Sequence, residues 1–192
     1  MQMKNAVFNE YADYYDHWFE THPGIYAAQL ALLRHIIPRG ERILDVGAGS
    51  GRFTSPLGIH HGIDPSPALL VMARQRGVET VLGLGEFLPY RAGTFDGVLM
   101  MTVICFFKDL DQAFREAYRV IRPGGKIVIG FFEKDGKIAL QEKHRKPAGR
   151  FLRYATFRYI NEVSTALDKA GFVGTVVVNN QSGFCTVTAQ KE

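Results

Sequence analysis

Residues 42–53 read RILDVGAGSGRF, a short apolar run that leads directly into glycines at every second position. A brief apolar run bounded by turn residues is typical of a strand buried on both faces of a parallel sheet. The glycines let backbone N–H groups come close to a ligand, and a helix starting behind them would add partial positive charge that suits a carboxylate or phosphate. This segment therefore predicts a strand, a ligand-binding turn and the beginning of a helix.

The spacing of these glycines argues against two common nucleotide-binding loops. A dinucleotide-binding loop needs the pattern GxGxxG, and the position three past Gly49 is Arg52. A phosphate-binding P-loop needs a GKS or GKT triplet, which does not follow here. Nicotinamide, flavin and P-loop nucleotide sites are therefore disfavoured.

Similar apolar runs recur along the chain, separated by segments with helical end signals. Ser66 is placed to cap a helix, and Asp109 with Gln112 resembles a capping box for a helix that stops at residues 123–125. A further helix near 161–170 precedes a terminal antiparallel hairpin. Because strands alternate with helices, we expect a parallel sheet with helices on both faces. The predicted strands are 42–46, 58–63, 79–82, 95–101 and 126–132, and the hairpin pairs 172–178 with 183–189.

The N-terminal residues predict two helices before the first strand. Aromatic residues recur at spacings of three and four in the first segment, as one face of an amphipathic helix requires. A second helix begins after Pro23 and stops at the Pro-Arg-Gly triplet at 38–40. The aromatic face of the first helix consists of Phe8, Tyr11, Tyr15 and Phe19.

The composition is that of an ordinary globular domain. The chain has 192 residues, of which 46% are hydrophobic and 22% charged, enough for one domain whose core needs no disulfide or metal. The longest uncharged apolar stretch, 97–107, is shorter than the roughly 20 residues that cross a bilayer, and the N-terminal sequence lacks the features of a secretory signal. Cys105 and Cys185 lie 80 residues apart without a CxxC pattern. We therefore expect a cytoplasmic protein without membrane contact.

Acidic residues after the second and third predicted strands point to a nucleoside. Asp64 ends the second strand, and its two carboxylate oxygens could hold both hydroxyls of a ribose. Glu86, in the loop after the third strand, could accept a hydrogen bond from an adenine amino group beside Phe87. Plainer interpretations stay open, because Asp64 could merely cap the next helix and Glu86 could be a solvated loop residue.

Four segments, in order and at matching spacing, carry a family resemblance. ILDVGAGSG, GIDPS, GEFLPYRAGTFDGV and RVIRPGGKIVI resemble the class I S-adenosylmethionine-dependent methyltransferases, above all the small methyltransferase type 11 kind, over residues 42–132. YDHWF at 15–19 is similar to a helix that often covers the cofactor in that family. The resemblance implies one α/β domain, 1–192, with an N-terminal helical cap (residues 1–38). Its sheet would be Rossmann-like, doubly wound, seven-stranded and mostly parallel, in the order 3-2-1-4-5-7-6, with an antiparallel last strand and helices on both faces.

The resemblance also implies a cofactor and the residues that bind it. The glycine backbone would face the methionine part of S-adenosylmethionine, Asp64 would hold the ribose, and Pro65 would lie near the adenine. The first crossover helix, 52–57, should be short, and its proline shortens it further. The expected cofactor-binding residues are Asp45, Gly47, Ala48, Gly49, Gly51, Asp64, Pro65, Glu86, Phe87 and Thr102. The expected substrate-binding residues are Tyr11, Tyr15, Trp18 and Val103.

Methyl transfer from a sulfonium asks for placement and little else. The methyl group is already electrophilic, so attack by an amine or ionised oxygen needs positioning, exclusion of water and at most one base. The sequence contains no Ser/His/Asp spacing, HExxH motif or cysteine-rich metal motif. We therefore assign no catalytic residue and no metal.

The net charge of +4 is concentrated in one part of the chain. Residues 134–158 hold eight basic and two acidic residues, a net charge of +6, so the rest of the chain carries −2. They form most of a basic insert (residues 133–158), at a position where family members often insert a substrate lid. A solvated loop, an anionic small substrate and a nucleic-acid backbone are all open as explanations.

These features predict a methyltransferase that uses S-adenosylmethionine, releases S-adenosylhomocysteine and acts on a nitrogen, oxygen or carbon of a small-molecule acceptor, with an anionic acceptor left open. Two alternatives remain, an RNA methyltransferase that uses the basic insert and a non-catalytic cofactor-binding protein. RNA is not favoured, because residues 101–104 lack the Asn/Asp-Pro-Pro-aromatic pattern of enzymes that methylate base amino groups, and no separate RNA-binding module is visible.

Overall fold

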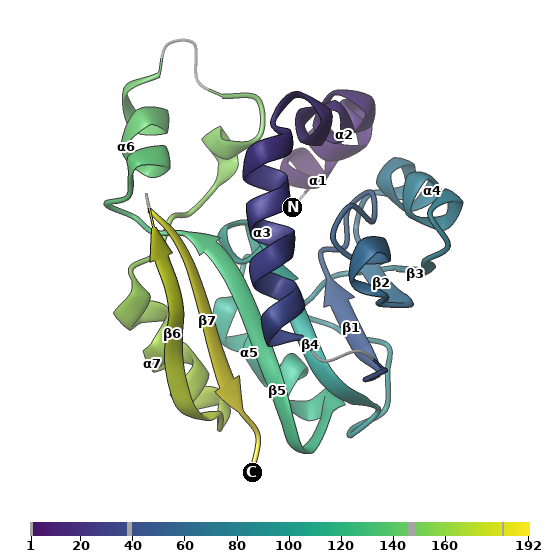
Figure 1. Ribbon diagram of the computed structural model, residues 1–192, viewed down its shortest axis with the longest axis vertical. Coiled ribbons are helices and arrows are strands. Elements are labelled where there is room, and N and C mark those ends of the chain that lie inside the picture. Colours follow the sequence, from purple (N-terminus) through teal and green to yellow (C-terminus); the bar gives the residue numbers. More distant parts are fainter. Residues whose placement is uncertain (1, 38–39, 146–148, 182) are drawn as a thin grey trace.

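The computed structural model describes the chain apart from residues 1, 38–39, 146–148 and 182. In this part, seven strands form one sheet of order β3-β2-β1-β4-β5-β7-β6 (Figure 1). Strand β7 runs antiparallel to both of its neighbours, and the other neighbouring pairs are parallel. The expected order and the antiparallel last strand are confirmed. The strands are β1 (Ile43–Val46), β2 (His61–Asp64), β3 (Glu79–Leu82), β4 (Phe95–Met101), β5 (Ile121–Phe132), β6 (Val173–Gln181) and β7 (Phe184–Gln190).

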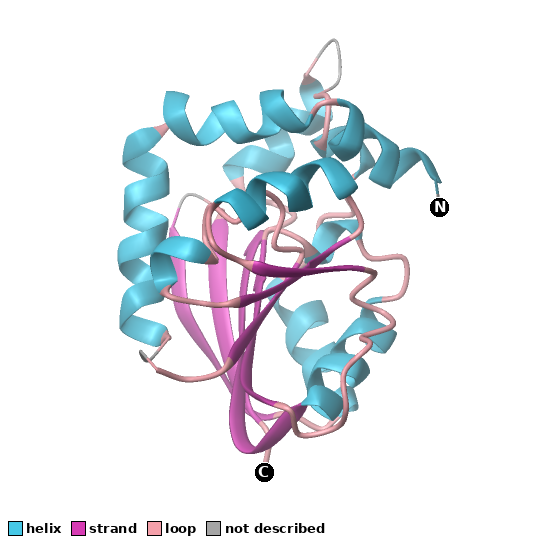
Figure 2. Cartoon of the chain, turned by 90° about the vertical axis from the view of Figure 1, so that its right-hand side faces the viewer, coloured by secondary structure: helices cyan, strands magenta, loops and turns pink. Residues whose placement is uncertain are grey.

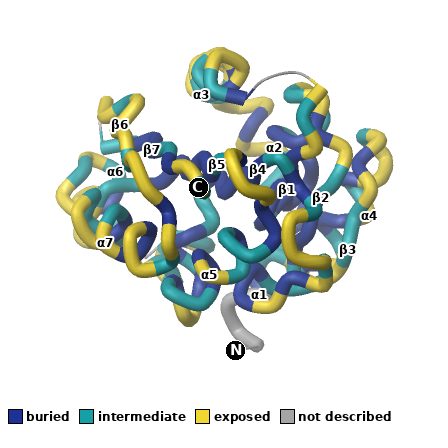
Figure 3. The backbone as a smooth tube through the Cα atoms, turned by 90° about the horizontal axis from the view of Figure 1, so that it is seen from below, coloured by how far each residue is buried: buried dark blue, intermediate teal, exposed yellow. Residues whose placement is uncertain are grey.

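Helices cover both faces of the sheet, as Figures 1 and 2 show. One face packs against α3 (Pro23–Ile36), and the other packs against α5 (Leu110–Val120) and α7 (Ile160–Ala170). Side chains alternate along β4, so Leu99 joins the α3 side and Met100 joins the α5 and α7 side. The central strands are therefore buried on both faces, whereas β6 at the sheet edge is largely exposed (Figure 3).

The N-terminal cap contains three helices, so the expectation of two is wrong. The first segment divides at Tyr11 into α1 (Gln2–Glu10) and α2 (Ala12–Thr21), because Tyr11 leaves the helical conformation with φ −116° and ψ 36°. The division lets α1 pack against α4 (Pro67–Gln75), where Asn9 Oδ1 accepts a hydrogen bond from the Ala68 N–H at 3.0 Å. The predicted stop of the third helix at Pro38 lies outside the described residues.

The crossover after β1 contains no α-helix. Residues 52–57 were expected to form a short one, but only a single 3₁₀ turn, η1 (Ser55–Leu57), is present, and it ends at Gly58 with φ +71°. The segment is short, and Pro56 lacks the N–H that an α-helix would need beyond its first turn. The partial charge of an α-helix start, expected behind the glycines, is therefore absent from this loop.

Other element boundaries also differ from the prediction, as at β2, which begins at His61 and not at residue 58. The Pro-Gly-Gly turn at 123–125 was expected to separate α5 from the fifth strand. Instead β5 already begins at Ile121, which pairs with Phe95, so the turn lies inside a long irregular strand. The terminal hairpin extends further than predicted, with Gln181 opposite Phe184. Ser182 of the predicted hairpin turn lies outside the described residues.

The basic insert contains two helical pieces that the sequence did not predict, α6 (Lys137–His144) and the 3₁₀ turn η3 (Leu152–Tyr154). A short turn, η2 (Ile104–Phe106), follows β4. In Figure 1 the insert and the helices α1 and α2 lie at the same end of the molecule, where β1 and β2 end. Lys146, one of the insert's eight basic residues, is outside the described residues. Among the helices that are described, none combines the length and apolar character that a membrane span requires.

Candidate functional site

The glycines after β1 adopt conformations that other residues avoid. Gly47, Gly49 and Gly51 have φ angles of +78°, +54° and +81°. A Cβ atom on Gly47 would lie 2.3 Å from Cγ2 of Val103, which is far inside van der Waals contact. This glycine loop (residues 47–51) therefore requires glycine, for its backbone conformation and for the close approach of the chain after β4.

The glycine loop is fastened to the end of β2. The N–H groups of Gly47 and Ala48 both donate to the Ile63 carbonyl, at 2.8 and 3.1 Å. The Gly49 N–H donates to Oδ2 of Asp64 at 2.9 Å. The predicted loop and the predicted ribose carboxylate are thus in direct contact.

Asp64 is buried and only partly used by the protein. Its Oδ1 accepts a hydrogen bond from the Ser66 N–H at 2.8 Å, and the hydroxyl of Ser66, not Asp64, caps α4 by accepting from Leu69 N–H. Burial raises the pKa of Asp64 to about 6, against the opposing effect of the hydrogen bonds from Ser66 and Gly49. Because a carboxylate oxygen has two lone pairs, each oxygen retains one acceptor position.

Asp45 is a second buried carboxyl group beside the loop. It is 1% exposed, its Oδ2 accepts from the Thr54 hydroxyl at 2.7 Å, and its Oδ1 has no hydrogen-bond partner in the described part of the chain. Burial raises the pKa of Asp45 to about 7; the Thr54 hydrogen bond opposes the rise and the charge of Asp64 adds to it. A buried polar atom without a partner is costly and suggests a ligand group.

Thr102, just past β4, has a strained backbone. Its φ is +54°, the left-handed region that a β-branched residue rarely enters, and its N–H donates to the Gly130 carbonyl at 2.7 Å. Such a conformation costs about 1–3 kcal/mol and persists only where the surroundings enforce it. Thr102 leads into Val103, whose side chain covers Gly47. The strained turn therefore places Val103 against the glycine loop.

The predicted adenine residues differ in their surroundings. Glu86 is 7% exposed, and its Oε1 accepts from the Lys108 N–H at 2.8 Å. Phe87 is 68% exposed, and Pro65 is half-buried. Glu86 thus ties the loop after β3 to the start of α5, and the ring of Phe87 lies on the surface.

Tyr15 of α2 lies over the glycine loop. A Cβ atom on Gly49 would stand 3.3 Å from the Tyr15 hydroxyl oxygen. Burial, together with the charges of Asp64 and Asp45, raises the pKa of Tyr15, so the phenol stays neutral. The helix that the family resemblance places over the cofactor therefore reaches the glycine loop.

An aromatic cluster continues from Tyr15 into the insert. The ring of Phe8 stacks on Phe151 at 4.8 Å and meets Phe106 edge-on at 5.0 Å, and Tyr15 meets both Phe8 and Phe151 edge-on. Sequence reasoning missed Phe8, Phe106 and Phe151 as neighbours of the site, because they come from three separate segments and no local pattern connects them.

The other predicted substrate residues lie further out in the cap. Tyr11 stacks under the guanidinium of Arg150 at 3.9 Å. Trp18 is 37% exposed and stacks on His22 at 4.5 Å. Of the four residues expected to contact substrate, Tyr15 and Val103 touch the glycine loop, and the rings of Tyr11 and Trp18 are occupied by partners of their own.

A cluster of charged residues that the sequence did not reveal joins the cap to the glycine loop. Asp16 accepts hydrogen bonds from Arg52 and Arg76, and Arg52 also pairs with Glu20. The signal was weak, because Asp16 stands inside an aromatic motif and its partners lie 36 and 60 residues away.

Most described basic side chains of the insert have partners inside the protein. Arg150 lies over Tyr11 and Tyr14, Arg153 over Tyr154, and Lys134 over Tyr159. Arg145 lies 3.8 Å from Glu142. Four of the insert's described basic side chains therefore lie against aromatic or acidic side chains of the cap, of the insert or of the residue that follows it.

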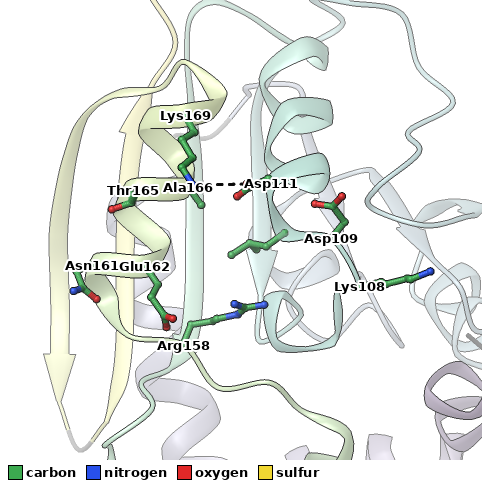
Figure 4. A pocket seen from close by; sticks show the side chains of 10 residues that line it. Lys108, Asp109, Asp111, Arg158, Asn161, Glu162, Thr165, Ala166 and Lys169 are labelled. Carbon is green, nitrogen blue, oxygen red and sulfur yellow. Dashed lines mark ion pairs between the residues drawn. The ribbon is translucent and has the colours of Figure 1, made fainter.

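A separate hollow of about 590 Å³ lies between α5 and α7. Figure 4 shows Arg158 and Lys169 on one side and Lys108, Asp109 and Asp111 on the other. No predicted site residue lines it. Within the described ranges, no group of three or more His, Cys, Asp or Glu side chains is arranged to hold a metal ion.

Comparison with known proteins agrees with this geometry. The model of a family described as "Methyltransferase domain" matches residues 44–129. An uncharacterised protein of Methanocaldococcus jannaschii is 36% identical over 166 residues, which cover 86% of this chain and 80% of that protein. An uncharacterised protein of Mycobacterium tuberculosis is 36% identical over 165 residues, which cover 82% of this chain and 57% of that protein. This chain therefore spans little more than half the length of the Mycobacterium tuberculosis protein.

Among solved structures, a Thermotoga maritima protein is similar over nearly its whole length. It is described as an S-adenosylmethionine-dependent methyltransferase and a possible histamine N-methyltransferase, and it is 28% identical with a TM-score of 0.90. The match covers 97% of this chain and 99% of that one. From the sheet order, the matched domain and these relatives, the chain belongs to the class I S-adenosylmethionine-dependent methyltransferases.

Proposed function

We propose that this protein binds S-adenosylmethionine at the glycine loop and transfers its methyl group to a small-molecule acceptor under the N-terminal cap. One observation carries the proposal: the glycine loop lies between two buried carboxyl groups, Asp45 and Asp64, and beneath Tyr15. Two buried acids favour a cationic ligand. The glycines beside them lack side chains, so a ligand can come close to the backbone of the loop.

The residues present fit the cofactor of the family. Asp45 has a buried oxygen without a partner, which suits the ammonium group of the methionine part. The two remaining acceptor positions of Asp64 suit a ribose diol, and Glu86 would accept from the adenine amino group. When bound, the cofactor supplies an electrophilic methyl group.

The chain's own contribution is to orient the reactants and to exclude water. Tyr15 and Val103 border the loop from two sides, and the strained turn at Thr102 fixes the second of them. The aromatic cluster around Phe8 and Phe151 joins the cap to the insert. A methyl transfer to a neutral amine needs this dry, positioned setting more than it needs a base.

A small acceptor is favoured over RNA because four of the seven described basic side chains of the insert already lie against aromatic or acidic side chains. Affinity for a nucleic-acid backbone requires basic side chains that are free to displace counterions, whereas Arg150 and Arg153 lie against aromatic rings and Arg145 lies beside Glu142. The description of the Thermotoga maritima relative, which names an amine, supports the same class of acceptor.

Calorimetry with two ligands tests the ribose assignment apart from the fold. S-adenosylhomocysteine and its 2′-deoxy analogue are titrated into the natural protein and into Asp64→Ala. The natural protein should prefer the ribose form by about tenfold or more, since a hydrogen bond to a charged acceptor contributes about 1.5–3 kcal/mol.

Asp64→Ala should bind both ligands weakly and equally. The comparison is needed because the substitution also removes the acceptor for the Gly49 N–H and so loosens the loop. A preference for ribose that survives in Asp64→Ala would refute the assignment, and absence of binding by the natural protein would refute the proposed function.

A further inference from the structure

Asp16 joins the N-terminal cap to two arginines of the cofactor side. Its Oδ1 accepts from Arg52 Nε at 2.9 Å, and its Oδ2 accepts from Arg52 Nη2 at 2.5 Å and from Arg76 Nη2 at 2.8 Å. Glu20, one turn later on α2, accepts from the same Arg52 Nη2 at 2.7 Å. These four side chains form a clasp between α2, the end of the glycine loop and the C-terminal end of α4.

Arg76 extends the clasp into the glycine loop itself. Its Nη1 donates to the Ser50 carbonyl at 2.7 Å, and its own carbonyl accepts from the Ser55 hydroxyl at 2.8 Å. From the opposite side Asp64 accepts from the Gly49 N–H. The loop is thus held at two successive residues, one through the cofactor-side acid and one through the clasp.

The clasp holds a segment that has no α-helix to stabilise it. Only a 3₁₀ turn follows Gly51, so residues 50–52 lack the backbone hydrogen bonds that the start of an α-helix would give them. Three of the four side chains of the clasp are well shielded, with exposed fractions of 13% for Asp16, 18% for Arg52 and 28% for Arg76, whereas Glu20 is exposed. Charge-assisted, multiply bonded pairs of this kind are strong and geometrically specific.

The ionisation of Asp16 agrees with this arrangement. Burial alone would raise its pKa, but the hydrogen bonds from Arg52 and the charges of Arg76 and Arg52 outweigh burial and bring the pKa down to about 2. The carboxylate therefore stays charged throughout the neutral range.

We propose that Asp16 is a positioning residue: through Arg52 and Arg76 it couples closure of the N-terminal cap to the conformation of the glycine loop, so the cofactor leaves only when the clasp opens. The proposal rests on the proposed function, since it concerns exchange at that site. Without the charge of Asp16, Arg52 and Arg76 lose their shared partner. Both α2, which carries Tyr15 over Gly49, and the Arg76 hydrogen bond to the Ser50 carbonyl then become less firmly held. A role in stability alone would not link these two regions.

Dissociation kinetics provide the first test. S-adenosylhomocysteine is bound to the full chain and displaced in a stopped-flow experiment, followed by fluorescence of Trp18, the one tryptophan of the sequence, which lies on α2. Asp16→Asn should release the ligand about tenfold faster or more. Asp13→Asn, an exposed acid on the same helix, is the matched control and should leave the rate unchanged.

Arg76→Gln supplies a second route that keeps the Arg52 pair with Asp16. Arg76→Gln alone should also accelerate release, and the double variant with Asp16→Asn should be little faster than either single variant. Independent, multiplying effects of the two substitutions would overturn the coupling.

Hydrogen exchange tests the coupling without relying on ligand. In Asp16→Asn, amides of α2 and amides of residues 49–52 should exchange faster to a similar degree, and in Asp13→Asn neither should. Faster exchange in α2 alone would overturn the proposal, because the clasp would then anchor the cap without reaching the loop. If the natural protein binds no S-adenosylhomocysteine, the proposed function fails, and the exchange result still decides whether the clasp couples the two regions.

Discussion

Cofactor affinity should rise with pH between 6 and 8, because a cationic ligand requires a charged Asp45. In the free protein, burial holds the pKa of Asp45 near 7 and that of Asp64 near 6. About nine-tenths of Asp45 is therefore ionised at pH 8 and about one-tenth at pH 6. If binding requires the carboxylate form, lowering the pH from 8 to 6 weakens affinity about tenfold through protonation of Asp45, and roughly twofold more through protonation of Asp64.

Titration calorimetry with S-adenosylhomocysteine at pH 6 and pH 8 measures this change, and repetition in buffers of different ionisation enthalpy counts the protons released. Asp45→Asn is the control, since its amide cannot ionise. It should bind more weakly at pH 8 and lose the tenfold part of the pH dependence. Equal affinity of the natural protein at both pH values, or an unchanged slope in Asp45→Asn, would refute the reasoning.

The same pKa values set the sign of a stability effect. The folded-state pKa values of Asp45 and Asp64 lie above the value of about 3.9 for an unfolded chain, so the folded state holds extra protons between about pH 4 and pH 7. Stability from these groups is fully present below pH 4 and is lost as the pH rises through 6 to 7. The free energy of unfolding in urea, without cofactor, should therefore be lower at pH 8 than at pH 5, and Asp45→Asn should show a smaller decrease.

Further substitutions test the architecture of the site. Gly47→Ala should abolish S-adenosylhomocysteine binding in calorimetry and lower stability in urea melts, because its Cβ would lie 2.3 Å from Val103. Adding Val103→Ala removes that clash and should restore part of the stability. It does not relieve the φ of +78°, so part of the loss should remain. Thr102→Gly should leave stability unchanged or raise it by about 1 kcal/mol in urea melts, since relief of the +54° φ offsets the entropy cost of glycine, and a clear loss of stability would refute the strain. Arg150→Gln should weaken docking of the insert on its two tyrosine rings by about 1 kcal/mol, seen as faster proteolysis near residue 150 without a change in the melting midpoint.

The sequence identified the fold because its signals are local and repeated. The run at 42–53 and the aspartate at 64 predict a strand, a turn and a second strand end, and the structure places Asp64 on the Gly49 N–H. The burial of β4 on both faces of the sheet follows directly from its apolar run. The turn residues at 123–125 misled, because a proline and two glycines can also sit inside an irregular strand whose neighbour accommodates them.

The remaining parts of the site depend on contacts between distant residues. Phe151 and Phe8 stack although 143 positions separate them, and Arg76 reaches Asp16 across 60 positions. No periodicity or short motif indicates such pairs. The number of basic residues in the insert likewise does not reveal that Arg150 lies over the ring of Tyr11. The sequence predicted the cofactor loop, and the structure was needed to find the clasp.

Transfer of a labelled methyl group tests the central claim most directly. The protein is incubated with S-adenosylmethionine labelled in the methyl group and a cell extract, and the label is then sorted into small molecules, RNA and protein. The account predicts that label appears in the small-molecule fraction and that Asp64→Ala strongly reduces it. Label in RNA instead, or no transfer to any fraction by a protein that binds S-adenosylhomocysteine, would contradict it.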